Sequence, residues 1–253
     1  MHVRLPKPLH GWRAFAGEVG IIVLGVLIAL GFGQVVEQWQ WRQEVGTTRQ
    51  AIDNELAVAA RQAAERLALE DCLHQRIGEL AARLNASDGQ WAADPMPAGS
   101  GTRQTPHWDK RSMERVYVVP LWGWSQDAWD TAKSNGVLNH MGHAEIAAYS
   151  DVYGEIAAIR ESQAQELALE SSLSFLSADQ RLDNSSRIDA LGRLGQLDAL
   201  NSVNAGLSSL ILDQIRAIHL RVDEARFARE LRSATAEERR YRGACVRDVR
   251  VEL

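Results

Sequence analysis

Residues 14–36, AFAGEVGIIVLGVLIALGFGQVV, decide how the rest of this chain is interpreted. From Val19 to Gly33 they contain no charged and no polar side chain, and Glu18 is the only charge in the segment. Twenty-three residues of α-helix extend about 35 Å, which is enough to cross the hydrocarbon core of a bilayer with some tilt. The segment therefore predicts a single transmembrane helix.

The residues on either side of this segment predict its orientation. The preceding residues, 1–13, carry Arg4, Lys7 and Arg13 and no acidic residue, whereas charges of both signs follow the segment. Because lysine and arginine beside a span stay in the cytoplasm, we expect a short cytoplasmic N-terminus and an extracytoplasmic domain at residues 37–253. In a bacterium this means the inner membrane, with the larger part of the chain in the periplasm.

A cleaved signal peptide is the alternative interpretation of the same segment. The basic N-terminus and the apolar run fit it, and Gly31 and Gly33 form a weak cleavage site. We favour a retained anchor because the run is long for a signal. In addition, Trp12, Trp39 and Trp41 lie where aromatic side chains meet lipid headgroups.

A stripe of small residues follows one side of the expected span. Gly25, Ala29 and Gly33 are four residues apart, and Glu18 lies about two helical turns before Gly25, so the four share one face. We expect this face to be a transmembrane packing surface, since small residues let a second helix approach closely. The alternative is that glycine is simply common in membrane helices and that Glu18 reaches the headgroups.

The rest of the chain is long enough for one sizeable domain with its own core. Apolar residues recur every three or four positions over most of it, and a polar DNSS at 183–186 separates two such stretches. Helices are therefore expected at residues 45–84, 125–136, 143–176 and 187–233. Glycine and proline gather between residues 86 and 106, which predicts a loop.

Several local signals refine this pattern. Ser125 is expected to cap the short helix, and Thr235 with Glu238 resembles a capping box that restarts the last one. Only Gly46 interrupts the pattern after the span, so one long helix is expected to leave the bilayer and continue into the domain. The strand signal VYVV at 116–119 is too short to build a sheet. The sequence thus predicts an all-α protein, a transmembrane helix followed by an antiparallel bundle of long helices.

The chain contains two cysteines, Cys72 and Cys245. In an oxidising compartment such a pair usually forms a disulfide, which here would close 173 residues and contribute about 4–5 kcal/mol by loop entropy. It would attach the C-terminal segment to the first long helix. The alternative is two unrelated buried thiols.

Tryptophans are concentrated in residues 107–130, HWDKRSMERVYVVPLWGWSQDAWD. We favour the interpretation that Trp122, Trp124 and Trp129 pack the loop and the short helix onto the long helices. The alternative is that these three rings form a binding face for a partner or for the membrane surface.

Motifs for catalysis or cofactor binding are absent from the sequence. It contains no G-x-S-x-G, glycine-rich phosphate loop, H-E-x-x-H or C-x-x-C. His140 and His143 form an H-x-x-H pair at the turn predicted around Gly142, without the further ligands of a zinc site. The net charge of −5 argues against nucleic acid as a partner. We therefore expect no enzymatic activity, no cofactor and no metal.

Two segments resemble a widespread family of uncharacterised bacterial single-pass inner-membrane proteins. The first has a glycine–glutamate pair and a Gly-x-Leu-Ile-Ala-Leu span, matched by Gly17, Glu18, Gly25, Leu27, Ile28, Ala29, Leu30 and Trp39. The second has an aromatic residue, a glycine turn and a helix with spaced tyrosines, matched by Trp129, Lys133, Gly136, Leu138, Met141, Tyr149 and Tyr153. This chain departs from the family at Gly31-Phe32-Gly33, where related sequences more often become polar. The resemblance implies a single-pass topology and no particular activity.

These observations together favour a non-enzymatic envelope protein. It would be anchored in the bilayer by one helix, and its helical domain would bind itself or another membrane or periplasmic protein. The alternative is a periplasmic sensor or an accessory subunit of a membrane complex. Its signal would have to leave through a partner, because only about a dozen residues precede the span.

Overall fold

The structure is a computed structural model and describes residues 12–94, 116–117, 119–251 and 253. Over these residues the chain is all-α, apart from two strands of two residues each. The elements in chain order are α1 (Trp12–Ala86), β1 (Gln90–Trp91), α2 (Asp127–Ser134), η2 (Val137–His140), α3 (His143–Ser172), η3 (Ser174–Ser177), β2 (Gln180–Arg181), α4 (Asn184–Ile218), α5 (Glu224–Arg242) and η4 (Gly243–Cys245).

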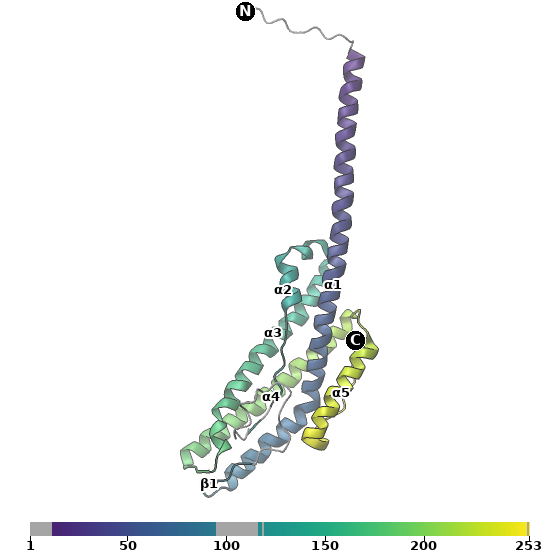
Figure 1. The fold of residues 1–253 in the computed structure, drawn as a ribbon. Helices are drawn as coiled ribbons and strands as arrows, with labels where there is room; N and C mark the ends of the chain where they lie inside the picture. Colours follow the sequence, from purple (N-terminus) through teal and green to yellow (C-terminus); the bar gives the residue numbers. More distant parts are fainter. Residues whose placement is uncertain (1–11, 95–115, 118, 252) are drawn as a thin grey trace, which may run out of the picture.

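The longest element, α1, has 75 residues and extends about 110 Å. It passes Gly46 without a break, so the prediction of one helix running from the apolar segment into the domain is confirmed. Its N-terminal part stands free of the other elements, and its C-terminal part lies among them (Figure 1). The first buried residue along the helix is Val45.

Within the domain α1 is the central helix, because α2, η2, α4 and α5 all pack against it. Small side chains make this possible by letting several neighbours approach one helix. Five alanines of α1 are buried: Ala59, Ala60, Ala63, Ala64 and Ala68. Leucine and isoleucine fill most of the other apolar core positions of α1, from Ile52 to Leu84.

The long helices do not alternate in direction. α1 and α3 run in the same direction, since their contacts advance together along both helices: Arg49 with Glu145, Asp53 with Tyr149, and Arg66 with Glu166. α4 runs opposite to α1, since Arg66 meets Asn201 and the later His74 meets the earlier Asp198. The expected antiparallel bundle is thus correct for α4 and wrong for α3.

The parallel arrangement is possible because the chain returns along the bundle before α3 begins. Val116, Tyr117 and residues 119–126 form an extended segment, here called the strap, between α1 and α3. Its contacts with α1 are Val116 with Arg76, Trp122 with Glu65 and Ser125 with Glu55. Its contacts with α3 are Tyr117 with Glu166, Trp124 with Gln163 and Gln126 with Tyr153.

Simple geometry accounts for the extended form of the strap. The stretch of α1 from Glu55 to Arg76 is about 32 Å long. The nine residue-to-residue steps from Val116 to Ser125 cover about 30 Å only if the chain is nearly straight. Val116, Tyr117 and Val119 of the VYVV signal lie in this crossover, where Val116 and Tyr117 form a bend and not a strand.

The three tryptophans of the strap and of α2 are interior side chains. Trp122, Trp124 and Trp129 are all buried, which corrects the alternative that they form an exposed binding face. The indole of Trp122 donates to Glu65 (3.0 Å) and that of Trp124 to Gln163 (3.1 Å). Trp129 stacks on the ring of Tyr153, with 5.3 Å between centroids. The three rings attach the strap and α2 to the long helices.

A short ladder closes the end of the domain that is farthest from the free part of α1. β1 pairs antiparallel with β2, Gln90 opposite Arg181. Gly89 precedes the ladder with a φ of 98°, and a Cβ there would lie 3.2 Å from the carbonyl of Leu182. Glycine is therefore required at this turn. Of the expected loop at 86–106, residues 95–106 lie outside the described part of the chain.

The short helix α2 begins at Asp127, two residues after the expected start at Ser125. The expected Ser125 does contribute to this end, since its hydroxyl accepts from the backbone amide of Asp127 (3.2 Å), although Gln126 holds the N-cap position. The carboxylate of Glu55 on α1 completes the cap by accepting from the backbone amide of Ala128 (3.1 Å) and from the hydroxyl of Ser125 (2.6 Å). A negative group at this place stabilises the N-terminus of α2.

The last expected helix, 187–233, is in fact two. α4 ends at Ile218 because His219 adopts a left-handed conformation with φ 56°. α5 then begins with Asp223 as its N-cap, whose side chain accepts from the amide of Arg226. Thr235 lies inside α5 and its hydroxyl donates to the carbonyl of Leu231, so the expected capping box is wrong.

The C-terminal segment is held on α1. Cys72 and Cys245 form a disulfide, with 5.0 Å between their Cα atoms. Two residues later the amide of Arg247 donates to the carbonyl of Ala68 (2.9 Å), and its guanidinium pairs with Glu70 and Asp71. The buried side chain of Val246 lies between these contacts.

Candidate functional site

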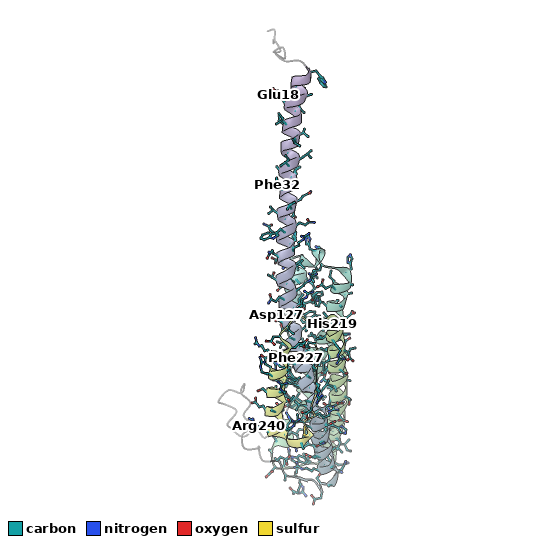
Figure 2. All side chains as sticks on the ribbon, turned by 90° about the vertical axis from the view of Figure 1, so that its right-hand side faces the viewer. Glu18, Phe32, Asp127, His219, Phe227 and Arg240 are labelled. Atoms are coloured by element: carbon teal, nitrogen blue, oxygen red, sulfur yellow. A yellow bond between two sulfur atoms is a disulfide. The ribbon has the colours of Figure 1, made fainter. Side chains whose placement is uncertain are left out.

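The apolar part of α1 is the most unusual surface of the molecule. Every residue from Phe15 to Gln40 is exposed, including large side chains such as Ile21 and Phe32. Figure 2 shows Glu18 and Phe32 on this part of the helix with no other element beside them. Among the described helices, this is the one stretch that is long and apolar enough to cross a membrane.

The charges that flank this stretch have the separation that a bilayer requires. Glu18 and Glu37 are its nearest acidic residues, and 19 residues of helix place them about 29 Å apart. A hydrocarbon core is about 30 Å thick. In an upright helix of a membrane protein, carboxylates with this separation would fall at the two boundaries of the core.

The predicted packing stripe lies on this free helix. Gly25, Ala29 and Gly33 are exposed, and a Cβ added at either glycine would meet nothing within 4 Å. The described chain thus leaves the stripe open, and its role in association stays a prediction, as does that of Glu18.

A second unpartnered surface runs along the outer side of α4. It consists of residues that recur every three or four positions: Ile188, Gly192, Gly195, Ala199, Val203, Gly206 and Leu210, here called the α4 face. All seven are exposed, Ile188 by 60%, Val203 by 51% and Leu210 by 41%. The charged residues of α4 lie beside this face, where Arg193 bonds to α3 and Asp198 to α1. An open groove between α3 and α4 continues it, lined by Gln165, Ala168, Leu169, Gln196, Ala199 and Leu200.

The core contains a polar layer that the sequence analysis did not anticipate. Arg66 and Glu166 are each only 1% exposed and form a bidentate ion pair at 2.9 and 3.0 Å. The carboxylate of Glu166 also accepts from the hydroxyl of Tyr117 and the amide of Asn204, both at 3.1 Å. Asn201 accepts from Arg66 at 3.0 Å. Four elements, α1, α3, α4 and the strap, therefore meet at one carboxylate.

A second polar layer lies one helical turn closer to the free part of α1. Gln62, Ser162 and Ser208 are four residues from Arg66, Glu166 and Asn204 on their helices, and the helix directions bring them to one level. All three are buried. Gln62 Oε1 and the two serine hydroxyls have no hydrogen-bond partner among the described residues.

Burial and charge together perturb the tyrosines of the core. Burial, and then the negative charge of Glu166, raise the pKa of Tyr117. Burial, and then the hydrogen bond to Glu55, raise the pKa of Tyr153. Burial, and then the charge of Asp53, raise the pKa of Tyr149. These phenols are therefore neutral donors to carboxylates over the physiological pH range.

The chemistry of these layers fits a structural role. The lone pairs of Glu166 are engaged by Arg66, Tyr117 and Asn204, and the pair lies in the interior. A buried ion pair of this kind fixes register, because shifting one helix by a turn leaves a charge without its partner. We attribute to it the relative alignment of α1, α3 and α4.

Metal ligands do not gather in the described part of the chain. No group of three or more His, Cys, Asp or Glu side chains there is close enough to hold a metal ion. His140 lies in η2 and stacks on the indole of Trp41, with ring centroids 3.9 Å apart, whereas His143 begins α3.

The sequence did carry a signal for the polar layers. Positions of α4 that alternate by four and three residues are all buried: Ala190, Leu194, Leu197, Asn201, Asn204, Ser208, Ile211 and Ile215. Such spacing marks the core side of a long helix. Asn201, Asn204 and Ser208 interrupt it with polar residues, while the apolar Ile188, Val203 and Leu210 lie on the opposite side.

The fold and these surfaces define an all-α domain built around one long helix whose N-terminal part is apolar and unpartnered. No protein-family model, no curated protein and no solved structure matches this chain. The resemblance to single-pass inner-membrane proteins therefore stays a prediction.

Proposed function

We propose that this chain is a non-enzymatic, membrane-anchored protein of the bacterial inner membrane whose periplasmic helical domain associates with a second copy of itself. Residues 14–36 would span the bilayer, with the N-terminus in the cytoplasm. The observation that carries the proposal is α1, a single helix whose apolar N-terminal stretch, residues 15–40, is exposed throughout and which enters the domain without a break.

Exposure of so many large apolar side chains supports a lipid environment. Soluble monomers rarely expose contiguous apolar patches of more than a few hundred Å². The stretch from Val19 to Gly33 is apolar on every side of the helix, which suits lipid and not one protein groove. The excess of basic residues before the span supports the proposed orientation.

Association through the α4 face is supported by its length and by its lack of charge. From Ile188 to Leu210 it extends about 33 Å. Its glycines and Ala199 let a facing helix approach closely, and the larger Ile188, Val203 and Leu210 supply apolar contact. In two copies anchored in one membrane, the α4 helices have the same polarity. A twofold axis along the membrane normal can then place the face against its own copy.

Topology is tested by fusing a periplasm-active and a cytoplasm-active reporter to the C-terminus and fractionating the cells. We expect the protein in the membrane fraction with only the periplasmic reporter active. Soluble periplasmic protein would show that the span is a cleaved signal, and an active cytoplasmic reporter would reverse the orientation.

Association is tested by single cysteines in the full-length chain. Because the only natural cysteines form a disulfide, Ala199→Cys introduces one free thiol on the proposed twofold contact. We expect it to give a covalent dimer on mild oxidation, and Ala236→Cys, exposed on α5, to give none. Equal dimer yields from both variants would exclude this interface. Gly25→Ile and Gly33→Ile in a membrane two-hybrid assay test the contribution of the span.

A further inference from the structure

The corner between α2 and α3, residues 131–144, lies at the end of the domain from which the free part of α1 emerges (Figure 1). It includes η2, which packs directly against α1. The contact is made at Trp41, whose indole stacks on the imidazole of His140 with an interplanar angle of 15°. The corner therefore lies at the level of Trp41 along the axis of α1.

That level coincides with the lipid headgroups of the proposed membrane. Trp41 follows Glu37 by four residues, which is about 6 Å of helix. A bilayer of about 40–45 Å with a hydrocarbon core of about 30 Å leaves headgroup layers of roughly 5–7 Å on each side. With Glu37 at the boundary of the core, Trp41 and His140 lie at the outer edge of the headgroup layer.

The corner is fixed in this position. Val137 is fully buried and Met141 nearly so, so both ends of η2 are anchored in the core. Gly136 supports the turn with a φ of 77° that favours glycine. Because α1 is a continuous helix between the span and Trp41, no hinge separates the corner from the bilayer.

The chemistry of the corner suits a phosphate surface. Residues 131–144 contain no aspartate or glutamate, although acidic residues flank them at Asp130 and Glu145. The exposed side chains include Lys133, Asn139, His140 and His143, all of which can donate hydrogen bonds. Lys133 forms a salt bridge with Asp130, and both side chains are exposed. A phosphate oxygen can therefore replace the Asp130 carboxylate as the partner of Lys133 at little cost in free energy.

We propose that this corner is a membrane-contact surface that rests on the lipid phosphate groups of the outer leaflet and holds the domain upright on the bilayer. The proposal rests on the membrane anchor proposed above. It adds a second contact between the domain and the bilayer, formed by a part of the chain about a hundred residues from the span.

A depth measurement on the full-length protein tests this contact. Three single-cysteine variants, Asn139→Cys, Ser174→Cys and Ala29→Cys, each carry one fluorescent label, since the natural cysteines are joined. The proteins are reconstituted into vesicles of phosphatidylethanolamine and phosphatidylglycerol that contain a headgroup nitroxide or an acyl-chain nitroxide. Ser174 is the matched control, exposed on η3 and about 50 Å farther from the bilayer along the α1–α3 alignment.

We expect the label at position 139 to lose most of its emission to the headgroup nitroxide and the label at 174 to lose almost none. The label at 29 reports the anchor and should be quenched by the acyl-chain nitroxide. Quenching at 29 with equal, weak quenching at 139 and 174 would overturn the membrane contact while leaving the anchor intact. Absence of quenching at 29 would overturn the anchor, and with it the contact.

A second label position, outside η2, controls for the case in which the Asn139→Cys variant disturbs η2 itself. His143→Cys places the probe on the first residue of α3, outside η2 but on the same corner. We expect the same headgroup quenching there as at position 139. If position 143 behaves like position 174, the membrane contact is wrong even where the Asn139→Cys variant folds poorly.

Discussion

Arg66 and Glu166 place a full charge pair in the centre of the domain, where neither group reaches water. Such a pair adds little net stability, because removing both charges from water costs about as much as their attraction returns. Removing only one of the two charges is different, because the remaining charge is then buried without a counter-ion. Both charges are therefore paired only when α1 and α3 are aligned as they are in the structure.

The first prediction concerns this pair. Glu166→Ala leaves Arg66 buried without a counter-ion, and we expect the free energy of unfolding to fall by about 3–5 kcal/mol. The matched control, Asp213→Ala, breaks the exposed pair with Arg216 and should cost less than about 1 kcal/mol. Urea unfolding followed by circular dichroism measures both.

The double variant Arg66→Met with Glu166→Leu completes that experiment. Removing both charges should recover most of the lost stability, since apolar residues of similar volume often replace a buried pair without cost. If Glu166→Ala costs no more than Asp213→Ala, the pair does not constrain the core.

The second prediction follows from the raised pKa values of Tyr117, Tyr149 and Tyr153. An unfolded chain loses phenolic protons near pH 10, whereas the folded chain keeps them, so unfolding releases protons above that pH. The ionisation of these phenols therefore leaves the free energy of unfolding constant below about pH 10 and lowers it as the pH rises beyond that value. The absorbance of tyrosinate should appear together with the loss of helix in a pH-jump experiment.

Tyr153→Phe isolates one of these groups. It removes the phenol that donates to Glu55 at 2.6 Å. The variant should lose less stability than the parent between about pH 9 and about pH 11. An identical loss in both proteins would mean that Tyr153 does not contribute to the alkaline transition.

Among the elements, the strap depends on contacts from both neighbouring helices. Its C-terminal end and the start of α2 share one carboxylate, that of Glu55, which also accepts from Tyr153 of α3. A single residue of α1 thus holds three other segments in place.

The third prediction is that Glu55→Ala loosens the strap and α2 while the distant helix α5 is unchanged. The loss of these hydrogen bonds should cost roughly 1–3 kcal/mol, because the donors that remain are partly buried. Hydrogen exchange read by mass spectrometry should rise for residues 119–135. Glu55→Gln keeps one acceptor oxygen and should show a smaller rise; uniform exchange changes across α5 as well would contradict a local role.

The sequence predicted the helices better than their arrangement. α1 was predictable because its apolar and alanine-rich positions repeat without a strong breaker, and α3 ends within a few residues of its expected limit. The end of α4 was not predictable from the sequence, since neither glycine nor proline marks it. His219 takes the left-handed conformation because Arg221 must meet α1, where its amide donates to Asp53. A tertiary contact ends the helix.

The parallel direction of α1 and α3 could not be predicted from the sequence for a related reason. Direction depends on whether the connection returns along the bundle, and the short strand signal VYVV at 116–119 does not specify a direction. Its tryptophans indicated packing but not which helices they contact. The polar layers are hard to recognise in the sequence because apolar residues occur on both faces of α4 and mask the alternation through Asn201 and Asn204.

At the scale of the whole molecule, the disulfide connects the long helix α1 with the C-terminal segment. α5 and the C-terminal segment lie on α1 through Cys245, Arg247 and the apolar contacts of Phe227 and Leu231. Without the covalent bond, these contacts alone must hold the segment.

The fourth prediction is that replacing both cysteines, Cys72→Ser with Cys245→Ser, lowers the free energy of unfolding by about 4–5 kcal/mol. The first amides to exchange should be those of residues 243–251, followed by α5. Thermal unfolding and hydrogen exchange measure the two effects. The parent protein in a reducing agent is the matched control and should behave like the double variant; equal stability of all three samples would contradict the prediction.

The same bond gives the molecule an unusual response to a protease. Cys72 lies in the first long helix and Cys245 near the C-terminus, so the chain between them is a closed covalent ring. A single cut at any of the 173 peptide bonds between the two cysteines opens the ring without dividing the protein. A domain nicked once, on its surface or in its crossover, therefore remains attached to its own N-terminal helix until a reductant separates the pieces.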